Sequence, residues 1–200
     1  MSKILISGYY GFANAGDEAM LTAIIESLRQ VEKNVELTVL SGNPEDTAAK
    51  HQVCSVYRFN PLGIIRTMKD SELIISGGGS LLQDVTSKRS LLYYLSIIGL
   101  GKFFGKKVML FAQGIGPIRA KWARKLTSLV CNEADLITVR DSESAAELIE
   151  MGVKPEKITV TADSVLSLNP VTKECGQYLL QEAGVDLTKP VIGISVRPWS

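Results

Sequence analysis

A glycine-rich segment near the start of the chain holds the residue types best suited to binding an anion or a sugar. Residues 8–18 read Gly-Tyr-Tyr-Gly-Phe-Ala-Asn-Ala-Gly-Asp-Glu. Glycine lets the backbone approach a ligand closely, and the first turn of a helix presents N–H groups to anions. We therefore expect Gly11, Asn14 and Gly16 to belong to a ligand-binding loop.

Two further interpretations of this segment bear on its chemistry. The spacing is not G-x-G-x-x-G, and no acidic residue closes the next apolar run to hold a ribose, so a nicotinamide or flavin site is disfavoured. A plain tight turn is the other interpretation, with Asp17 as the N-cap and Glu18 stabilised by the helix dipole. Because Asn14 and Asp17 make the loop more polar than a turn requires, the ligand-binding loop is favoured.

Similar glycine segments follow later apolar runs. Ser76-Gly-Gly-Gly-Ser80 leads into Asp84, and Gln113-Gly-Ile-Gly-Pro117 has the same place after the next run. Ordering three successive glycines is entropically costly, which predicts that their amides face a ligand and do not serve packing. The candidate substrate-binding residues of these segments are Gly77, Gly78, Gly79, Asp84, Gln113 and Gly114.

Arg140 is the candidate catalytic cation. It ends the apolar run 136–139, where a long cation is unusual unless it grips a carboxylate or a phosphate. A structural ion pair with Asp141 or Asp163 would produce the same sequence pattern. Arg197 has the analogous place after the apolar run 191–196 and is a further candidate for substrate binding.

Composition restricts the class of protein. The 200 residues carry a net charge of +1 with mixed signs, so wholesale binding of nucleic acid is not expected. The odd number of cysteines and the absence of C-x-x-C indicate reduced thiols in a cytoplasmic protein, without a metal site. We expect no signal peptide and no membrane span, because the chain begins almost directly with a strand and lacks a run of about 20 apolar residues. The only histidine, His51, lies in a polar stretch and is expected to be a solvated loop residue without a catalytic role.

Strand-like runs of Val, Ile and Leu alternate with helical patterns along the chain. Such runs predict a parallel sheet covered on both faces, so the expected fold class is α/β, a doubly wound Rossmann-like domain. Because carboxyl ends of parallel strands converge, the glycine segments are expected to line one cleft. The predicted strands are 3–7, 35–40, 73–76, 108–112, 136–139, 158–161 and 191–196, and the predicted helices are 15–31, 61–70, 89–104, 119–133, 142–151 and 174–184.

The last part of the chain predicts a change of domain. Residues 169–189 have the Pro and Gly content of a linker around one short helix, and residues 190–200 read as a new strand and loop. We therefore expect residues 1–168 to form the first domain and 190–200 to begin a second Rossmann-like domain that is cut short.

Taken in order, these segments resemble the polysaccharide pyruvyl transferases, most closely the CsaB type. The resemblance rests on Gly8-x-x-Gly11-x-x-Asn14-x-Gly16-Asp17-Glu18, Ser76-Gly-Gly-Gly-Ser-Leu-Leu-Gln-Asp84, Gln113-Gly-Ile-Gly-Pro117 and Val139-Arg-Asp-Ser142. It covers essentially the whole chain, but only the N-terminal half of such enzymes. It implies the N-terminal half of a GT-B-like two-domain fold with the active site between the halves.

The resemblance also implies an activity. The family transfers the enolpyruvyl unit of phosphoenolpyruvate to a sugar and closes a pyruvate ketal, and the CsaB type acts on N-acetylmannosamine of a lipid-linked cell-wall precursor for surface-layer anchoring. Arg140 matches the family's phosphoenolpyruvate-binding arginine, and Asp17 or Asp84 would orient or deprotonate a hydroxyl. The family's histidine and a further basic residue belong to the other half, so residues 1–200 alone are expected to be inactive. No cofactor or metal is implied beyond phosphoenolpyruvate as donor substrate.

Two rival functions share this architecture, a GT-B glycosyltransferase that uses a nucleotide sugar and a non-catalytic glycan-binding protein. The segment 88–107 is a very apolar helix with basic ends. It is expected mainly to pack on the sheet, and the alternative is contact with an anionic membrane surface, which would place the protein at the inner face of the membrane.

Overall fold

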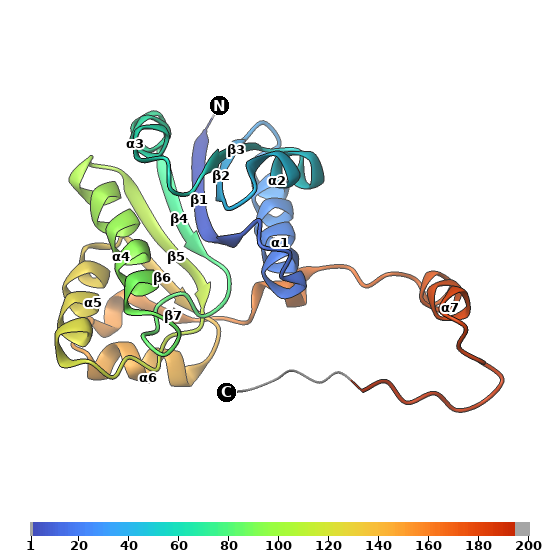
Figure 1. Cartoon of the computed structure of the whole chain (residues 1–200). Coiled ribbons are helices and arrows are strands. Elements are labelled where there is room, and N and C mark those ends of the chain that lie inside the picture. The colour runs from blue at the N-terminus through green and yellow to red at the C-terminus, as the bar shows by residue number, and fades with distance from the viewer. Residues whose placement is uncertain (1, 195–200) are drawn as a thin grey trace. The chain divides into compact units, whose positions relative to one another are not determined.

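A seven-stranded parallel sheet forms the centre of residues 1–168, the first of two compact units (Figure 1). The computed structural model describes residues 2–194. The strand order is β3-β2-β1-β4-β5-β6-β7, which confirms the predicted α/β Rossmann-like class. The strands are β1 (Lys3–Tyr10), β2 (Glu36–Ser41), β3 (Cys54–Tyr57), β4 (Leu73–Gly77), β5 (Lys107–Gln113), β6 (Leu136–Val139) and β7 (Ile158–Val160).

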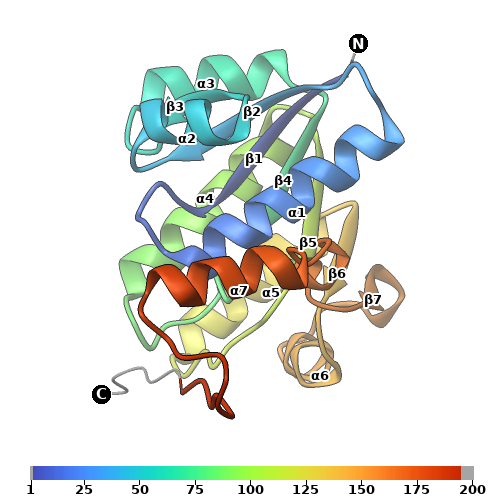
Figure 2. The ribbon, with the colours of Figure 1, turned by 90° about the vertical axis from the view of Figure 1, so that its right-hand side faces the viewer.

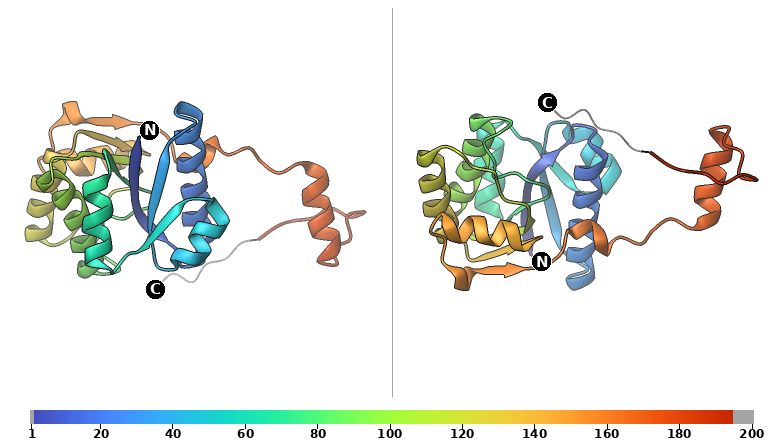
Figure 3. Two further views of the ribbon diagram at one scale, coloured as in Figure 1. Left: turned by 90° about the horizontal axis from the view of Figure 1, so that it is seen from above. Right: turned by 90° about the horizontal axis from the view of Figure 1, so that it is seen from below.

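Helices cover both faces of this sheet. Seen from above, α1 lies on one side of the sheet and α4 and α5 lie on the other (Figure 3). Each crossover between parallel strands is a helix, as right-handed βαβ units require. The elements are α1 (Ala15–Val31), α2 (Pro44–His51), α3 (Pro61–Asp70), α4 (Lys88–Phe103), α5 (Lys121–Glu133), α6 (Ser142–Glu150), and the short 3₁₀ helices η1 (Pro155–Lys157) and η2 (Ser164–Ser167).

Two hydrophobic clusters hold the helices to the sheet. On one face, α1 lies beside β1 and β4 (Figure 2). Leu21 and Ile24 of α1 pack against Ile6 of β1 there, in a cluster that also includes residues of β2 and β4. On the other face, α3 to α6 bury apolar side chains against β1, β2, β4, β5 and β6. Alternate residues of a strand point to opposite faces, so Leu5 and Ile6 of β1 belong to different clusters.

The topological switch point of the sheet, where the direction in which successive strands are added changes, lies between β1 and β4. Strands β2 and β3 extend the sheet on one side of β1, and β4 to β7 extend it on the other. Parallel pairing aligns Leu5 of β1 with Thr38 of β2 and with Ile74 of β4. In open α/β sheets, the loops after two such strands diverge and leave room for a ligand at the carboxyl edge.

Among the described residues, one α-helix, two short 3₁₀ helices and one strand were not predicted by the sequence analysis. Helix α2 begins with an Asn43 cap and Pro44 at its first position, and β3 is a four-residue edge strand. His51 is therefore the last residue of α2, and the predicted solvated loop was wrong. Its side chain is only 8% exposed.

Residues 169–200 form the second unit. It contains α7 (Lys173–Glu182), close to the predicted helix 174–184. Residues 191–194 have no regular secondary structure, so the strand predicted at 191–196 is not found in its described part. Arg197 lies outside the described residues. The division into a domain, a linker and the beginning of a second domain stays a prediction.

The carboxylate of Asp135, directly before β6, connects α4 and β5 at the amino edge of the sheet. It accepts hydrogen bonds from Lys102 Nζ at 2.7 Å, from Val108 N–H at 2.9 Å and from Lys107 Nζ at 3.2 Å. Burial alone would raise the pKa of Asp135, but these donors lower it to about 2.

This shift predicts acid sensitivity. Because the pKa of Asp135 is lower in the folded than in the unfolded chain, its stabilisation is complete above about pH 4 and is lost as the pH falls towards 2. Asp135→Asn should lower the free energy of unfolding at pH 7 by about 1 kcal/mol, after allowance for partial exposure. Urea unfolding between pH 2 and 7 should show wild type and variant converging at the acid end. A constant difference across that range would contradict the prediction.

Candidate functional site

The loops after β1, β4, β5 and β6 meet at the carboxyl edge of the sheet. Gly114 N–H donates to Gly79 O at 3.1 Å, and Gly116 N–H donates to Leu82 O at 2.8 Å. From β1, Tyr10 Oη donates to Gly77 O at 2.7 Å. The prediction that these segments share one edge of the sheet is confirmed.

Arg140 stands directly after β6 and joins these loops through its guanidinium. Nη1 donates to Asp163 Oδ2 at 3.2 Å, Nη2 donates to Ser80 Oγ at 3.2 Å, and Nε lies 3.4 Å from Asp141 Oδ2. Both ion pairs considered in the sequence analysis are therefore present. The Arg140 side chain is 33% exposed, and an arginine has five N–H donors, so contact with a ligand is compatible with these pairs.

The guanidinium of Arg140 and the hydroxyl of Ser80 occupy the space that a side chain at position 114 would need. A Cβ there would lie 2.8 Å from Arg140 Nε and Nη2 and 2.6 Å from Ser80 Oγ. Any larger residue would have to displace Arg140 or Ser80. Gly114 therefore allows the guanidinium to lie across the backbone of the β5 loop.

Packing explains two of the three successive glycines. A Cβ on Gly77 would lie 2.8 Å from Ile24 Cδ1, and one on Gly78 would lie 2.8 Å from Tyr10 Oη. Gly78 and Gly79 also have positive φ angles of 85° and 64°. The expectation that these glycines do not serve packing was wrong for Gly77 and Gly78, whereas their contact with a ligand stays a prediction. Gly79 faces Asp17, whose Oδ1 lies 3.0 Å from the position of a Cβ.

The loop that begins α1 is held by its own side chains. Asn14 is the N-cap, and not Asp17 as in the tight-turn interpretation; its Oδ1 accepts from Gly16 N–H at 3.1 Å and from Asp17 N–H at 3.5 Å. The first amides of α1 are thus already bonded, which corrects the expectation that they are open to an anion. Gly11 has a φ of 77°, and a Cβ there would lie 2.1 Å from Ser41 Oγ.

Glu18 connects the same loop to α2. Its Oε1 accepts from Gly11 N–H at 2.9 Å, and its Oε2 lies 3.0 Å from His51 Nε2. Both side chains are largely buried. His51 therefore helps to position the glycine loop through Glu18, which is a role that the sequence analysis did not assign.

Asp84 has a structural partner. Its carboxylate accepts from Arg119 N–H at 3.0 Å and from Ala120 N–H at 2.9 Å, directly before α5 begins. Ala120, the N-cap residue of α5, provides no side-chain cap itself. Although desolvation raises the pKa of Asp84, the bonds from Ala120 and Arg119 bring it below its ordinary value. Asp84 thus caps α5 from a distant loop.

Gln113 is fully buried at the end of β5. Its Nε2 donates to Ser76 Oγ at 2.8 Å, and its Oε1 has no hydrogen-bond partner among residues 2–194. The side chain therefore lies beneath the loops, where it can support Ser76. Direct contact between Gln113 and a substrate stays a prediction.

An aromatic cluster around Arg58 was missed by the sequence analysis. The rings of Tyr9 and Phe12 stack with centroids 4.3 Å apart, and each side chain is about two-fifths exposed. The guanidinium carbon of Arg58 lies 5.3 Å from the Phe12 centroid and 4.4 Å from the Tyr93 centroid. Arg58 itself is 5% exposed and donates to Tyr94 Oη at 3.3 Å. The available signal was an arginine between two aromatic residues, Tyr57 and Phe59, after an apolar run.

Comparison with known proteins identifies the family. The family model for polysaccharide pyruvyl transferase matches residues 14–192. The chain belongs to this family. No curated protein sequence matches the chain significantly.

The fold of the chain is also similar to that of several solved structures. The chain is similar to HepE from Anabaena in complex with UDP and glucose, with a TM-score of 0.58, 13% identity, and coverage of 92% of this chain and 50% of that one. It is also similar to a glycosyltransferase from Rickettsia africae, with a TM-score of 0.58, 12% identity, and coverage of 94% and 51%. For the UDP-GlcNAc 2-epimerase of Neisseria meningitidis the values are 0.57, 13%, 92% and 54%. This polysaccharide pyruvyl transferase family member thus spans about half the length of these structures.

Residues 2–194 contain neither a candidate metal-ion site nor a candidate membrane-spanning helix. Within that range, no three or more His, Cys, Asp or Glu side chains are grouped so that they could hold a metal ion. No helix in the same range is both long and apolar enough to cross a membrane.

The capping role of Asp84 predicts a loss of stability. Asp84→Ala would leave the N–H groups of Arg119 and Ala120 without this acceptor and should lower the free energy of unfolding by about 1–2 kcal/mol. Asp84→Asn should cost less, because its amide oxygen still accepts. Chemical denaturation of both variants measures this. Unchanged stability of Asp84→Ala would show that the cap is dispensable.

Proposed function

We propose that this protein transfers the enolpyruvyl unit of phosphoenolpyruvate to N-acetylmannosamine in a lipid-linked precursor of a secondary cell-wall polysaccharide. The family gives the reaction class, pyruvyl transfer in polysaccharide biosynthesis. The observation that supports the donor site is Arg140, which is joined to Ser80, Asp141 and Asp163 at the edge where four loops meet. N-acetylmannosamine and the lipid carrier rest on the resemblance of the sequence motifs to the CsaB type.

Arg140 would grip the carboxylate or phosphate of phosphoenolpyruvate. A guanidinium binds such groups through two parallel N–H bonds, and its orientation here is fixed by its partners. Asp141 and Asp163 place two negative charges beside one positive charge. The anionic donor therefore needs further cations, for which Arg197 and residues beyond this chain are the candidates.

The reaction would proceed by addition and loss of phosphate. Protonation of the methylene carbon leaves an oxocarbenium-like centre at C2, and a sugar hydroxyl attacks it. Phosphate then leaves and the second hydroxyl closes the ketal. Asp17 lies beside Gly79 at the same edge, and Asp17 or Asp84 is the candidate to orient or deprotonate a hydroxyl. General acid–base steps of this kind contribute ~10²–10⁴-fold each.

The stacked rings of Tyr9 and Phe12 would receive the acceptor sugar. Both rings are partly exposed; Tyr9 lies in β1 and Phe12 in the glycine loop that follows it. The guanidinium of Arg58 makes cation–π contacts with both rings. Exposed aromatic faces offer apolar surface to the C–H face of a ring, and a few polar groups then fix its orientation. Gly11 and Asn14 belong to the same loop as Phe12, and Gly16 lies in the first turn of α1.

The assay that tests the function compares donors. The full-length protein is incubated with a synthetic N-acetylmannosamine acceptor and with phosphoenolpyruvate or UDP-sugars, and phosphate release and ketal formation are followed. Ketal formed from phosphoenolpyruvate alone is expected. Transfer from a UDP-sugar would instead establish a glycosyltransferase, and binding of glycan without turnover would establish a binding protein.

Replacing Arg140 should abolish most of the activity. Arg140→Ala should lower kcat/KM by ~10²–10³-fold, because a charge-assisted contact in the transition state is lost. Arg140→Lys should restore little, since lysine lacks the planar fork. Arg119→Ala, an exposed arginine of the same region, is the matched control. Circular dichroism and urea unfolding separate this effect from a loss of stability, and near-normal kinetics in a folded Arg140→Ala protein would refute the donor role.

Gly114→Ala tests the same site without removing a charge. The added methyl group would displace the guanidinium of Arg140, so KM for phosphoenolpyruvate should rise by about tenfold with little change in far-UV circular dichroism. Gly99→Ala in α4 is the control, because among the described residues no atom outside the neighbouring helix backbone lies within 4 Å of that Cβ position. Equal kinetics for the two variants would contradict the argument.

A further inference from the structure

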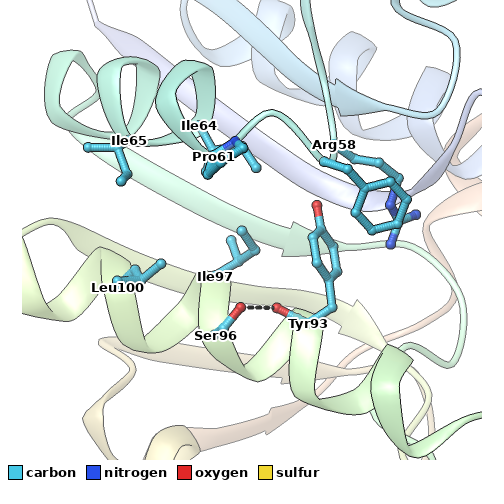
Figure 4. A pocket seen from close by; sticks show the side chains of 9 residues that line it. Arg58, Pro61, Ile64, Ile65, Tyr93, Ser96, Ile97 and Leu100 are labelled. Carbon is cyan, nitrogen blue, oxygen red and sulfur yellow. Dashed lines mark hydrogen bonds between the residues drawn. The ribbon is translucent and has the colours of Figure 1, made fainter.

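A groove between α3 and α4 remains unexplained by the proposed reaction. It has a volume of about 300 Å³. Figure 4 shows Ile64 and Ile65 of α3 across from Tyr93, Ile97 and Leu100 of α4. The rings of Phe59 and Tyr93, which both line the groove, lie 5.7 Å apart. Lys69 Nζ of α3 lies 5.2 Å from the centroid of Phe104, the residue after α4.

The outer surface around this groove is unusually apolar. Leu62 of α3 and Phe103 of α4 are each 80% exposed, and Phe59 is 60% exposed. Leu91, Leu95 and Ile98 bury the inner side of α4, so its packing on the sheet is already satisfied. A surface helix normally carries polar residues on its outer side, whereas α4 has no charged residue between Arg89 and Lys102.

The charges near the groove are almost all positive. The segment 88–107 contains Lys88, Arg89, Lys102, Lys106 and Lys107 and no acidic residue. In α3, Arg66 and Lys69 are exposed, and Asp70 is its single acidic residue, at the last position. Lys102 and Lys107 are paired with Asp135, so Arg66, Lys69, Lys88, Arg89 and Lys106 supply most of the positive field.

We propose that the α3–α4 face, defined by residues 59–69 and 88–106, docks on an anionic phospholipid bilayer. Exposed Leu and Phe side chains enter the region between headgroups and acyl chains, and the surrounding Lys and Arg side chains bind anionic headgroups. A second copy of the chain fits this face poorly, because pairing two such faces would bring like charges together. The docking itself is independent of the proposed reaction; its use in delivering a lipid-linked acceptor rests on that proposal.

The experiment measures cosedimentation of the purified protein with vesicles of phosphatidylglycerol and phosphatidylcholine. We expect binding to mixed anionic vesicles, little binding to pure phosphatidylcholine, and weakening by salt. Leu62→Ser combined with Arg66→Glu should reduce the partition coefficient by about tenfold or more, since each basic residue near an anionic surface contributes about 1 kcal/mol. Phe103→Ser is a second, independent variant.

The matched control combines Val31→Ser and Lys33→Glu. Val31 ends α1, on the other side of the sheet, and is 89% exposed, and Lys33 is also exposed. This variant should bind as the wild type does. Absence of binding to anionic vesicles, equal binding to neutral vesicles, or an equal loss in the control would overturn the proposal, as would self-association that the Leu62 and Arg66 changes abolish. No phosphoenolpyruvate or glycan is present, so failure of pyruvyl transfer would not affect this outcome.

Discussion

The guanidinium of Arg140 is the group on which the carboxyl edge of this sheet depends. Asp141 and Asp163 balance its charge, Ser80 binds it from the β4 loop, and Gly114 leaves the space in which it lies. A partly exposed cation held by three partners loses little entropy when a ligand arrives, because its orientation is already fixed. The same contacts join the loops after β4 and β6 to the segment around Asp163, which are far apart in sequence.

The glycine loops pack closely against the core of the domain. Gly77, Gly78 and Gly11 are required by close packing against Ile24, Tyr10 and Ser41. Tyr10 Oη bonds the carbonyl of Gly77, and burial raises the pKa of Tyr10, so the phenol stays protonated as a donor. The loops are therefore packed parts of the core edge, and the donor site that we propose would be built on them.

A second cation, Arg58, is buried among aromatic rings on the β3 side of the same edge. Its Nε and Nη1 have no hydrogen-bond partner among the described residues, and the faces of Tyr93 and Phe12 provide electrostatic compensation. Burial raises the pKa of Tyr93 to about 12 even beside this cation. Arg58 thereby links the exposed Tyr9–Phe12 stack to α4, the helix whose outer side forms the apolar and basic surface.

From the sequence one could predict the α/β class, the order of most elements and the gathering of the glycine segments at one edge. Long apolar runs and helical spacing reflect burial, which is a local property of each segment, and parallel strands must end at a common edge. Helix α2 and strand β3 were not predicted, because α2 is polar and β3 is a short edge strand, although Asn43-Pro44 is a typical helix start. The roles of the polar residues, by contrast, depend on partners that folding brings close to them. Asp84 caps a distant helix, His51 is paired with Glu18, and Gly77 accommodates Ile24, because these partners lie 33 to 53 residues away along the chain and are brought together by packing alone.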